Sequence, residues 1–196
     1  MSVNLLEKIQ QNLHYPPLQK IDPNTEKVVE DKSKPDEHRF SQAAIPAILT
    51  ALYNYSKNDE GAKAILSGDN STNWLASVFG DDNEFFTSKI GEYAYQEQPS
   101  VKLNAIASEA VRVIKEHLGA EATMMDVKEL LASQMNTFLL YLPEELHLGA
   151  SMNDTTLDDN THKMEGPIST LMHKIGSAFA KPTSEEEIKQ NQRVTN

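Results

Sequence analysis

Carboxylates and one imidazole gather between residues 154 and 165, where they could bind a metal ion. Oxygen and nitrogen ligands of this kind suit Ca²⁺, Mg²⁺ or Zn²⁺. The residues are Asp154, Asp158, Asp159, His162 and Glu165. The spacing does not fit an EF-hand, because position six counted from Asp158 is Lys163 and position twelve is Ser169. We therefore interpret this segment as a solvated acidic loop without metal or cofactor. The alternative is an enzyme or metal-dependent protein that uses residues 154–165, and it predicts that divalent cations raise the melting temperature.

Other catalytic signals are weak. His117 follows Val113 and Ile114 on an apolar helical face, but a general base requires a positioned partner, and none is identifiable nearby in the sequence. We expect His117 to pack or to cap its helix, where the dipole favours a positive charge. The chain has no cysteine, no Gly-rich phosphate loop and no Gly-x-Ser-x-Gly elbow. These absences favour a non-catalytic protein.

The charge balance excludes one large class of partners. With 18 basic and 29 acidic residues among 196, the net charge of −11 repels a phosphate backbone, so we expect no nucleic-acid binding. The first residues lack the pattern of a secretory signal, and no stretch is apolar enough to span a bilayer. Because only Lys163, Lys174 and Lys181 lie on or near the last helix, we expect no strong peripheral membrane contact. We expect a cytoplasmic protein.

Apolar residues recur at helical spacing through most of the chain, and no segment alternates like a strand. We predict an all-α fold, an irregular bundle of about seven to eight short amphipathic helices. The expected organisation is a helical domain at 1–148 with a polar linker at about 22–38, a polar loop at 149–166, an accessory helix at 167–180 and an exposed tail at 181–196.

Several residues predict where helices begin. Candidate N-caps are Ser2, Asn58 or Asp59, Ser71 or Thr72, and Thr123, which with Asp126 resembles a capping box. Pro46 interrupts an apolar helix that contains Ile45, Ile48, Leu49 and Leu52. Since proline lacks an N–H, we predict that this helix begins near Ser41 and that Pro46 starts or bends it near its first turn.

Two features predict the core. The most regular apolar stripe consists of Val127, Leu130, Leu131, Met135 and Phe138. Trp74, the only tryptophan, lies on a short predicted helix with Leu75, Val78 and Phe79, and we expect it to anchor the core.

The segment "IPAILTALYNYSKNDEGAKAIL", residues 45–66, resembles the signature of the bacterial domain-of-unknown-function family numbered 937, the YidB-like proteins. The matching residues are Ile45, Pro46, Ala47, Ile48, Leu49, Glu60, Gly61, Ala62, Ala64, Ile65 and Leu66. The resemblance implies an all-α bacterial protein. The family has no established catalytic residues, so it carries no functional site over to this chain.

The C-terminal helix offers a candidate partner-binding surface. Its apolar stripe consists of Ile168, Leu171, Met172, Ile175 and Phe179. Such a stripe either covers a groove on its own core or binds a protein partner or a second copy. Together these features favour a non-catalytic protein-interaction or scaffold module.

Overall fold

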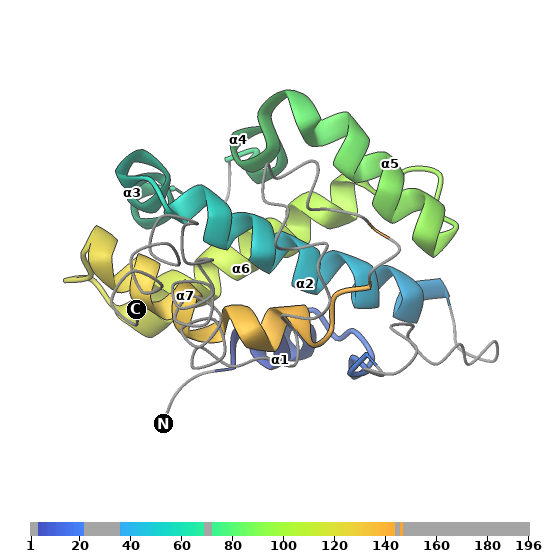
Figure 1. Ribbon diagram of the computed structural model, residues 1–196, viewed down its shortest axis with the longest axis horizontal. Coiled ribbons are helices and arrows are strands. Elements are labelled where there is room, and N and C mark those ends of the chain that lie inside the picture. Colours follow the sequence, from blue (N-terminus) through green and yellow to red (C-terminus); the bar gives the residue numbers. More distant parts are fainter. Residues whose placement is uncertain (1–3, 22–35, 69–71, 144–145, 147–196) are drawn as a thin grey trace, which may run out of the picture. The chain divides into compact units, whose positions relative to one another are not determined.

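The computed structural model describes residues 4–21, 36–68, 72–143 and 146, which are built from helices and contain no β-strand (Figure 1). This confirms the all-α prediction. The elements are α1 (Leu5–Asn12), α2 (Asp36–Ser56), α3 (Asp59–Ser67), α4 (Trp74–Phe79), the 3₁₀ turn η1 (Gly80–Asp82), α5 (Asn83–Ala94), α6 (Ser100–Leu118) and α7 (Met124–Leu139). The loop, accessory helix and tail expected at 149–196 lie outside the described residues.

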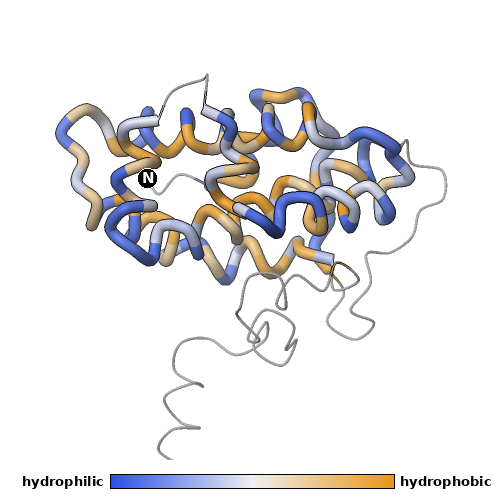
Figure 2. The backbone as a smooth tube through the Cα atoms, turned by 90° about the horizontal axis from the view of Figure 1, so that it is seen from above, coloured by the Kyte–Doolittle hydropathy of each residue, from blue (hydrophilic) through white to orange (hydrophobic). Residues whose placement is uncertain are grey.

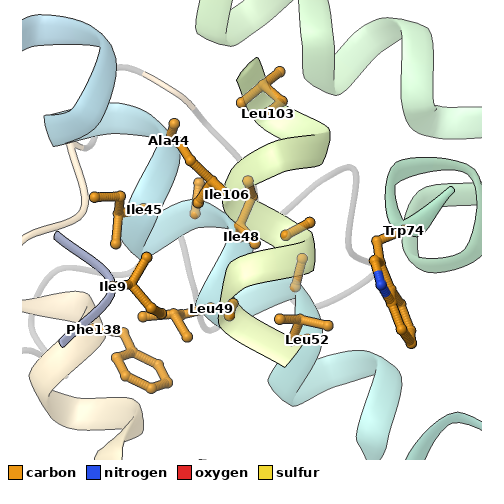
Figure 3. Close-up of a cluster of buried hydrophobic side chains, with 14 of the residues drawn as sticks. Ile9, Ala44, Ile45, Ile48, Leu49, Leu52, Trp74, Leu103, Ile106 and Phe138 are labelled. Carbon is orange, nitrogen blue, oxygen red and sulfur yellow. The ribbon is translucent and has the colours of Figure 1, made fainter. Parts of the chain in front are cut away.

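Helix α2 forms the centre of the packing, because it contacts each of the other α-helices. Every residue from Phe40 to Leu52 is buried, on all sides of the helix. Figure 3 shows Ile45, Ile48 and Leu49 of α2 among side chains from α1, α6 and α7. The surrounding helices are amphipathic, and hydrophobic and hydrophilic residues alternate along them in Figure 2. A helix that is buried on all sides needs such a complete cover.

Pro46 lies in the middle of α2, so the prediction that it marks the first turn is wrong. The helix begins at Asp36, before the expected Ser41, and continues through Pro46 to Ser56. An internal proline removes one backbone hydrogen bond and costs about 3 kcal/mol or more. Burial of large aliphatic side chains such as Ile48 and Leu49 contributes about 1.5–3 kcal/mol each and offsets that cost. Tertiary packing therefore overrides the local preference.

The polar linker expected at about 22–38 is shorter at its C-terminal end than the sequence indicates. Asp36, Glu37 and His38 belong to the first turn of α2. His38 is buried, and its Nε2 lies 3.2 Å from the carbonyl oxygen of Pro17. The charged residues of this stretch predict a solvated linker rather than a helix start. The burial of His38 depends on the Pro17 carbonyl, a partner that the local sequence does not reveal.

Two predicted helix starts are confirmed. Asn58 caps α3 through its side chain, which accepts a hydrogen bond from the Gly61 N–H at 2.6 Å. Thr123 and Asp126 form a full capping box on α7, in which the Thr123 N–H donates to the Asp126 carboxylate at 2.7 Å. Both caps satisfy donors that the first helical turn leaves free.

Two other caps are corrected. Helix α1 is capped by Asn4 rather than Ser2, and α4 is capped by Asn73 rather than Ser71 or Thr72. The asparagine side-chain oxygen accepts a hydrogen bond from the N–H three residues further on, Glu7 in α1 and Ala76 in α4, as a serine or threonine hydroxyl also can. The sequence thus offered several equivalent acceptors a few residues apart.

The predicted core residues are largely confirmed. Val127, Leu131 and Phe138 of α7 are buried, while Leu130 and Met135 are partly buried against the same core. Trp74 is 1% exposed and anchors α4, as expected. Its ring packs against Gly68, where a Cβ atom would lie 2.2 Å from the tryptophan Cζ2. Only glycine permits this approach of the chain after α3.

Candidate binding groove

An open groove of about 820 Å³ lies along α5, the turn that follows it and the first turn of α6. We call it the α5–α6 groove. Its lining comprises Asn83, Glu84, Thr87, Ser88, Gly91, Glu92, Tyr95, Gln96, Glu97, Gln98, Pro99, Ser100 and Val101. Because α5 leads directly into α6 through a short turn, one continuous piece of chain forms the whole groove.

Helix α5 exposes its groove face because its opposite face is fixed to the core. Phe86 and Ile90 are fully buried, and the Phe86 ring stacks on Phe79 with a centroid distance of 3.8 Å. Glu84 and Ser88, one turn apart, point away from that core and are exposed. The helical period therefore places the polar side chains of α5 in the groove.

The turn after α5 is a Schellman motif with tyrosine where glycine is usual. Tyr95 adopts the left-handed conformation, with φ 55° and ψ 39°, and the Gln96 N–H donates to the Gly91 carbonyl at 2.9 Å. A Cβ atom on Gly91 would lie 2.8 Å from the Gln96 carbonyl oxygen. Glycine at 91 thus lets the turn fold back tightly against α5.

Tyr95 and Val101 form the apolar part of the groove. They are 74% and 82% exposed, the largest exposed fractions among the large hydrophobic residues in the described part of the chain. The guanidinium of Arg39 lies 5.1 Å from the centre of the Tyr95 ring and supports it from α2. A non-glycine residue in the left-handed region costs about 1–2 kcal/mol, so glycine would adopt this backbone conformation with less strain.

The lining of the groove is mostly polar. Its lining contains carboxylates, amides and hydroxyls but no histidine, lysine, arginine or cysteine. The Ser88 hydroxyl donates to the Glu92 carboxylate at 3.3 Å, and the same carboxylate forms an ion pair with Lys89 at 3.2 Å. Among the described residues no group of three or more potential ligands is placed to hold a metal ion.

None of the residues predicted as sites from the sequence is among the described residues that line the α5–α6 groove. Asp154, Asp158, Asp159, His162 and Glu165, and the stripe from Ile168 to Phe179, lie outside the described residues. His117 is exposed, so the expectation that it packs is wrong, and no capping hydrogen bond from it is found in the described part of the chain. It lies in the last turn of α6, where the core no longer reaches around the helix.

Sequence reasoning missed the groove. The acidic stretch from Asp81 to Glu84 forms η1 and the start of α5, and its charge alone does not distinguish it from any other helix start. The groove face of α5 resembles any solvated helix face, and the left-handed conformation of Tyr95 has no signature in the sequence. The break "YQEQPS", residues 95–100, was the only available signal of a turn.

None of the described helices has the length and apolar character needed to cross a membrane. No protein-family model, curated protein or solved structure matches the chain.

Proposed function

We propose that this protein is a non-catalytic protein-interaction or scaffold module of the bacterial cytoplasm, and that the α5–α6 groove is its binding surface. The bacterial origin rests on the resemblance of residues 45–66 to the YidB-like proteins. The exposed tyrosine carries the proposal for the groove. Tyr95 occupies a backbone conformation that favours glycine, and yet the residue is 74% exposed at the edge of the groove.

Two further observations support an interaction surface. Aromatic residues are enriched in the buried centres of protein interfaces, and Val101 provides a second exposed apolar contact in the same groove. The groove lies on rigid elements, because Phe86 and Ile90 fix α5 to the core. A preformed surface of this kind loses less conformational entropy on binding than a mobile loop does.

The proposal is tested by selecting peptides from a random display library against the full-length protein. Selected peptides should lose most of their affinity for the double variant Tyr95→Gly/Val101→Ser. The matched control is Met124→Ser/Met125→Ser, which removes two exposed apolar side chains from the start of α7. Equal loss of affinity in both variants, or none in the first, would show that the groove is not the binding surface.

Tyr95→Gly is useful because it should preserve the fold. Glycine relieves the left-handed strain but loses the contact with Arg39 and increases the entropy of the unfolded chain. These effects oppose each other, so the free energy of unfolding should stay within about 1 kcal/mol of the wild type. A loss of binding in this variant then reports on the surface.

A further inference from the structure

We propose that the α5–α6 groove binds a lysine- or arginine-rich segment of a partner protein. This inference rests on the proposed function, since it takes the groove as the binding surface and adds the chemistry of its partner. It is carried by the charges in the groove and by the apolar surface beside them.

The groove carries unpaired negative charge. Its lining contains the carboxylates of Glu84, Glu92 and Glu97 and no cationic side chain. Glu92 forms an ion pair with Lys89 at 3.2 Å. Glu84 and Glu97 are exposed, and neither forms an ion pair or side-chain hydrogen bond with another described residue. Two carboxylates are therefore available to a cationic ligand.

The nearby cations do not neutralise these two carboxylates. Arg39 lies against the Tyr95 ring, and the Lys102 ammonium lies 5.6 Å from the centre of the Phe40 ring and 3.4 Å from the Gln96 side-chain oxygen. Neither cation lines the groove. Arg39 and Lys102 are instead held by cation–π attraction to the rings of Tyr95 and Phe40.

Long basic side chains fit the remaining surface. Lysine and arginine bury their aliphatic stems along apolar groups while their charged ends stay polar. Val101, which is 82% exposed, offers an apolar surface for such a stem within the same lining as the free carboxylates. An acidic segment would face both these carboxylates and the net charge of −11, so the groove discriminates against it.

Fluorescence anisotropy with the full-length protein tests the inference. The probes are three fluorescein-labelled peptides of about twelve residues. They share leucine and glycine positions and differ only in whether the remaining positions carry lysine, glutamine or glutamate. We expect the lysine peptide to bind at least about tenfold more tightly than the glutamate peptide in about 50 mM NaCl, and less tightly in about 500 mM NaCl.

The groove carboxylates are tested with Glu84→Gln/Glu97→Gln, which should weaken binding of the lysine peptide by about three- to tenfold. The control Glu121→Gln/Glu129→Gln removes the same charge at exposed positions outside the groove and should leave the affinity within about twofold. Equal effects of the two double variants, or no binding of the lysine peptide, would overturn the inference.

The inference and the proposed function fail in different ways. If the glutamine peptide binds as tightly as the lysine peptide and Tyr95→Gly/Val101→Ser weakens both, the groove is a binding surface but does not select basic segments. If library-selected peptides also bind the wild type and this variant equally, the proposed function fails with it.

Discussion

The side-chain amide of Gln42 forms two hydrogen bonds with the backbone N–H and carbonyl of Gln19. Its amide group donates to the Gln19 carbonyl at 2.9 Å, and its oxygen accepts from the Gln19 N–H at 2.8 Å. The same amide group donates to the Tyr141 carbonyl at 2.8 Å. Gln42 is 1% exposed. One buried side chain of α2 thereby joins the segment after α1 to the end of α7.

Gln42→Leu should lower the free energy of unfolding by about 2–4 kcal/mol, because it leaves three backbone groups without their partner. Chemical denaturation with Trp74 fluorescence measures the loss. Gln11→Leu, on the exposed side of α1, is the matched control and should change stability by less than about 0.5 kcal/mol. A similar small effect at Gln42 would mean that water replaces the lost hydrogen bonds.

Phe138→Ala should destabilise the fold by about 3–5 kcal/mol, since Phe138 is fully buried and its removal leaves a cavity. Leu130→Ala should cost less, about 1–2 kcal/mol, because Leu130 is only partly buried. Urea denaturation of both variants checks this order. Equal losses would indicate that Leu130 is as fully packed as Phe138.

Gly68→Ala should destabilise by about 1–3 kcal/mol through overpacking. The new methyl group would lie within 2.4 Å of two carbon atoms of the buried Trp74 ring. The expected signature is a lower melting temperature together with a shifted Trp74 emission. Gly119→Ala is a contrasting variant, because no atom lies within 4 Å of the added carbon, and only its φ of 82° introduces strain. It should leave the tryptophan emission unchanged.

The melting temperature should fall as the pH is lowered below about 4.5, in part because of Glu109. Hydrogen bonds from Arg112 hold the pKa of Glu109 below its ordinary value of 4.5, and a further hydrogen bond from Asn12 acts in the same direction. A depressed pKa in the folded state adds stability that is present above the ordinary pKa and lost on acidification. The pKa values of Asp59 and Asp126 are lowered as well, by Lys128 and Thr123.

Glu109→Gln should therefore be less stable than the wild type at neutral pH and lose less of its stability between pH 5 and pH 3. Melting curves across this range provide the measurement. Glu129→Gln, at an exposed position on α7 without an ion pair among the described residues, should follow the wild-type profile. Parallel profiles for Glu109→Gln and the wild type would contradict the assignment.

Truncation after Gly149 should leave a cooperatively folded domain. The described helices bury one another's apolar faces, and Leu142 and Leu146 already belong to their core. Circular dichroism should show an unchanged helical signal per residue for 1–149, with binding of a hydrophobic dye if the stripe from Ile168 to Phe179 covers the core. Loss of cooperative unfolding would mean that this stripe is part of the core.

The sequence predicted those parts of the fold that depend on local chemistry. Asn58 and the Thr123–Asp126 capping box act within one helical turn, and the stripe containing Val127, Leu131 and Phe138 follows from the period of the helix. The position of Pro46 was predicted wrongly. The backbone hydrogen bond that proline removes is a local effect, whereas the burial that offsets its loss comes from the helices packed around α2.

The remaining features depend on partners far away in the chain. Gln42 is separated by 23 residues from Gln19 and by 99 from Tyr141, and no periodicity reveals such a pairing. The α5–α6 groove was missed for a related reason, since its polar side chains resemble a solvated face until the turn at Tyr95 brings the start of α6 alongside.

The central position of α2 has a consequence for synthesis on the ribosome. Helix α2 ends at Ser56, while α7, which packs on it, ends only at Leu139. At usual rates of translation the nascent chain carries an incompletely covered apolar helix for on the order of 4–17 s. Its buried residues from Phe40 to Leu52 are then a natural target for chaperones that bind hydrophobic segments. Slow translation between these two helices should lower the yield of folded protein in cells that lack such chaperones.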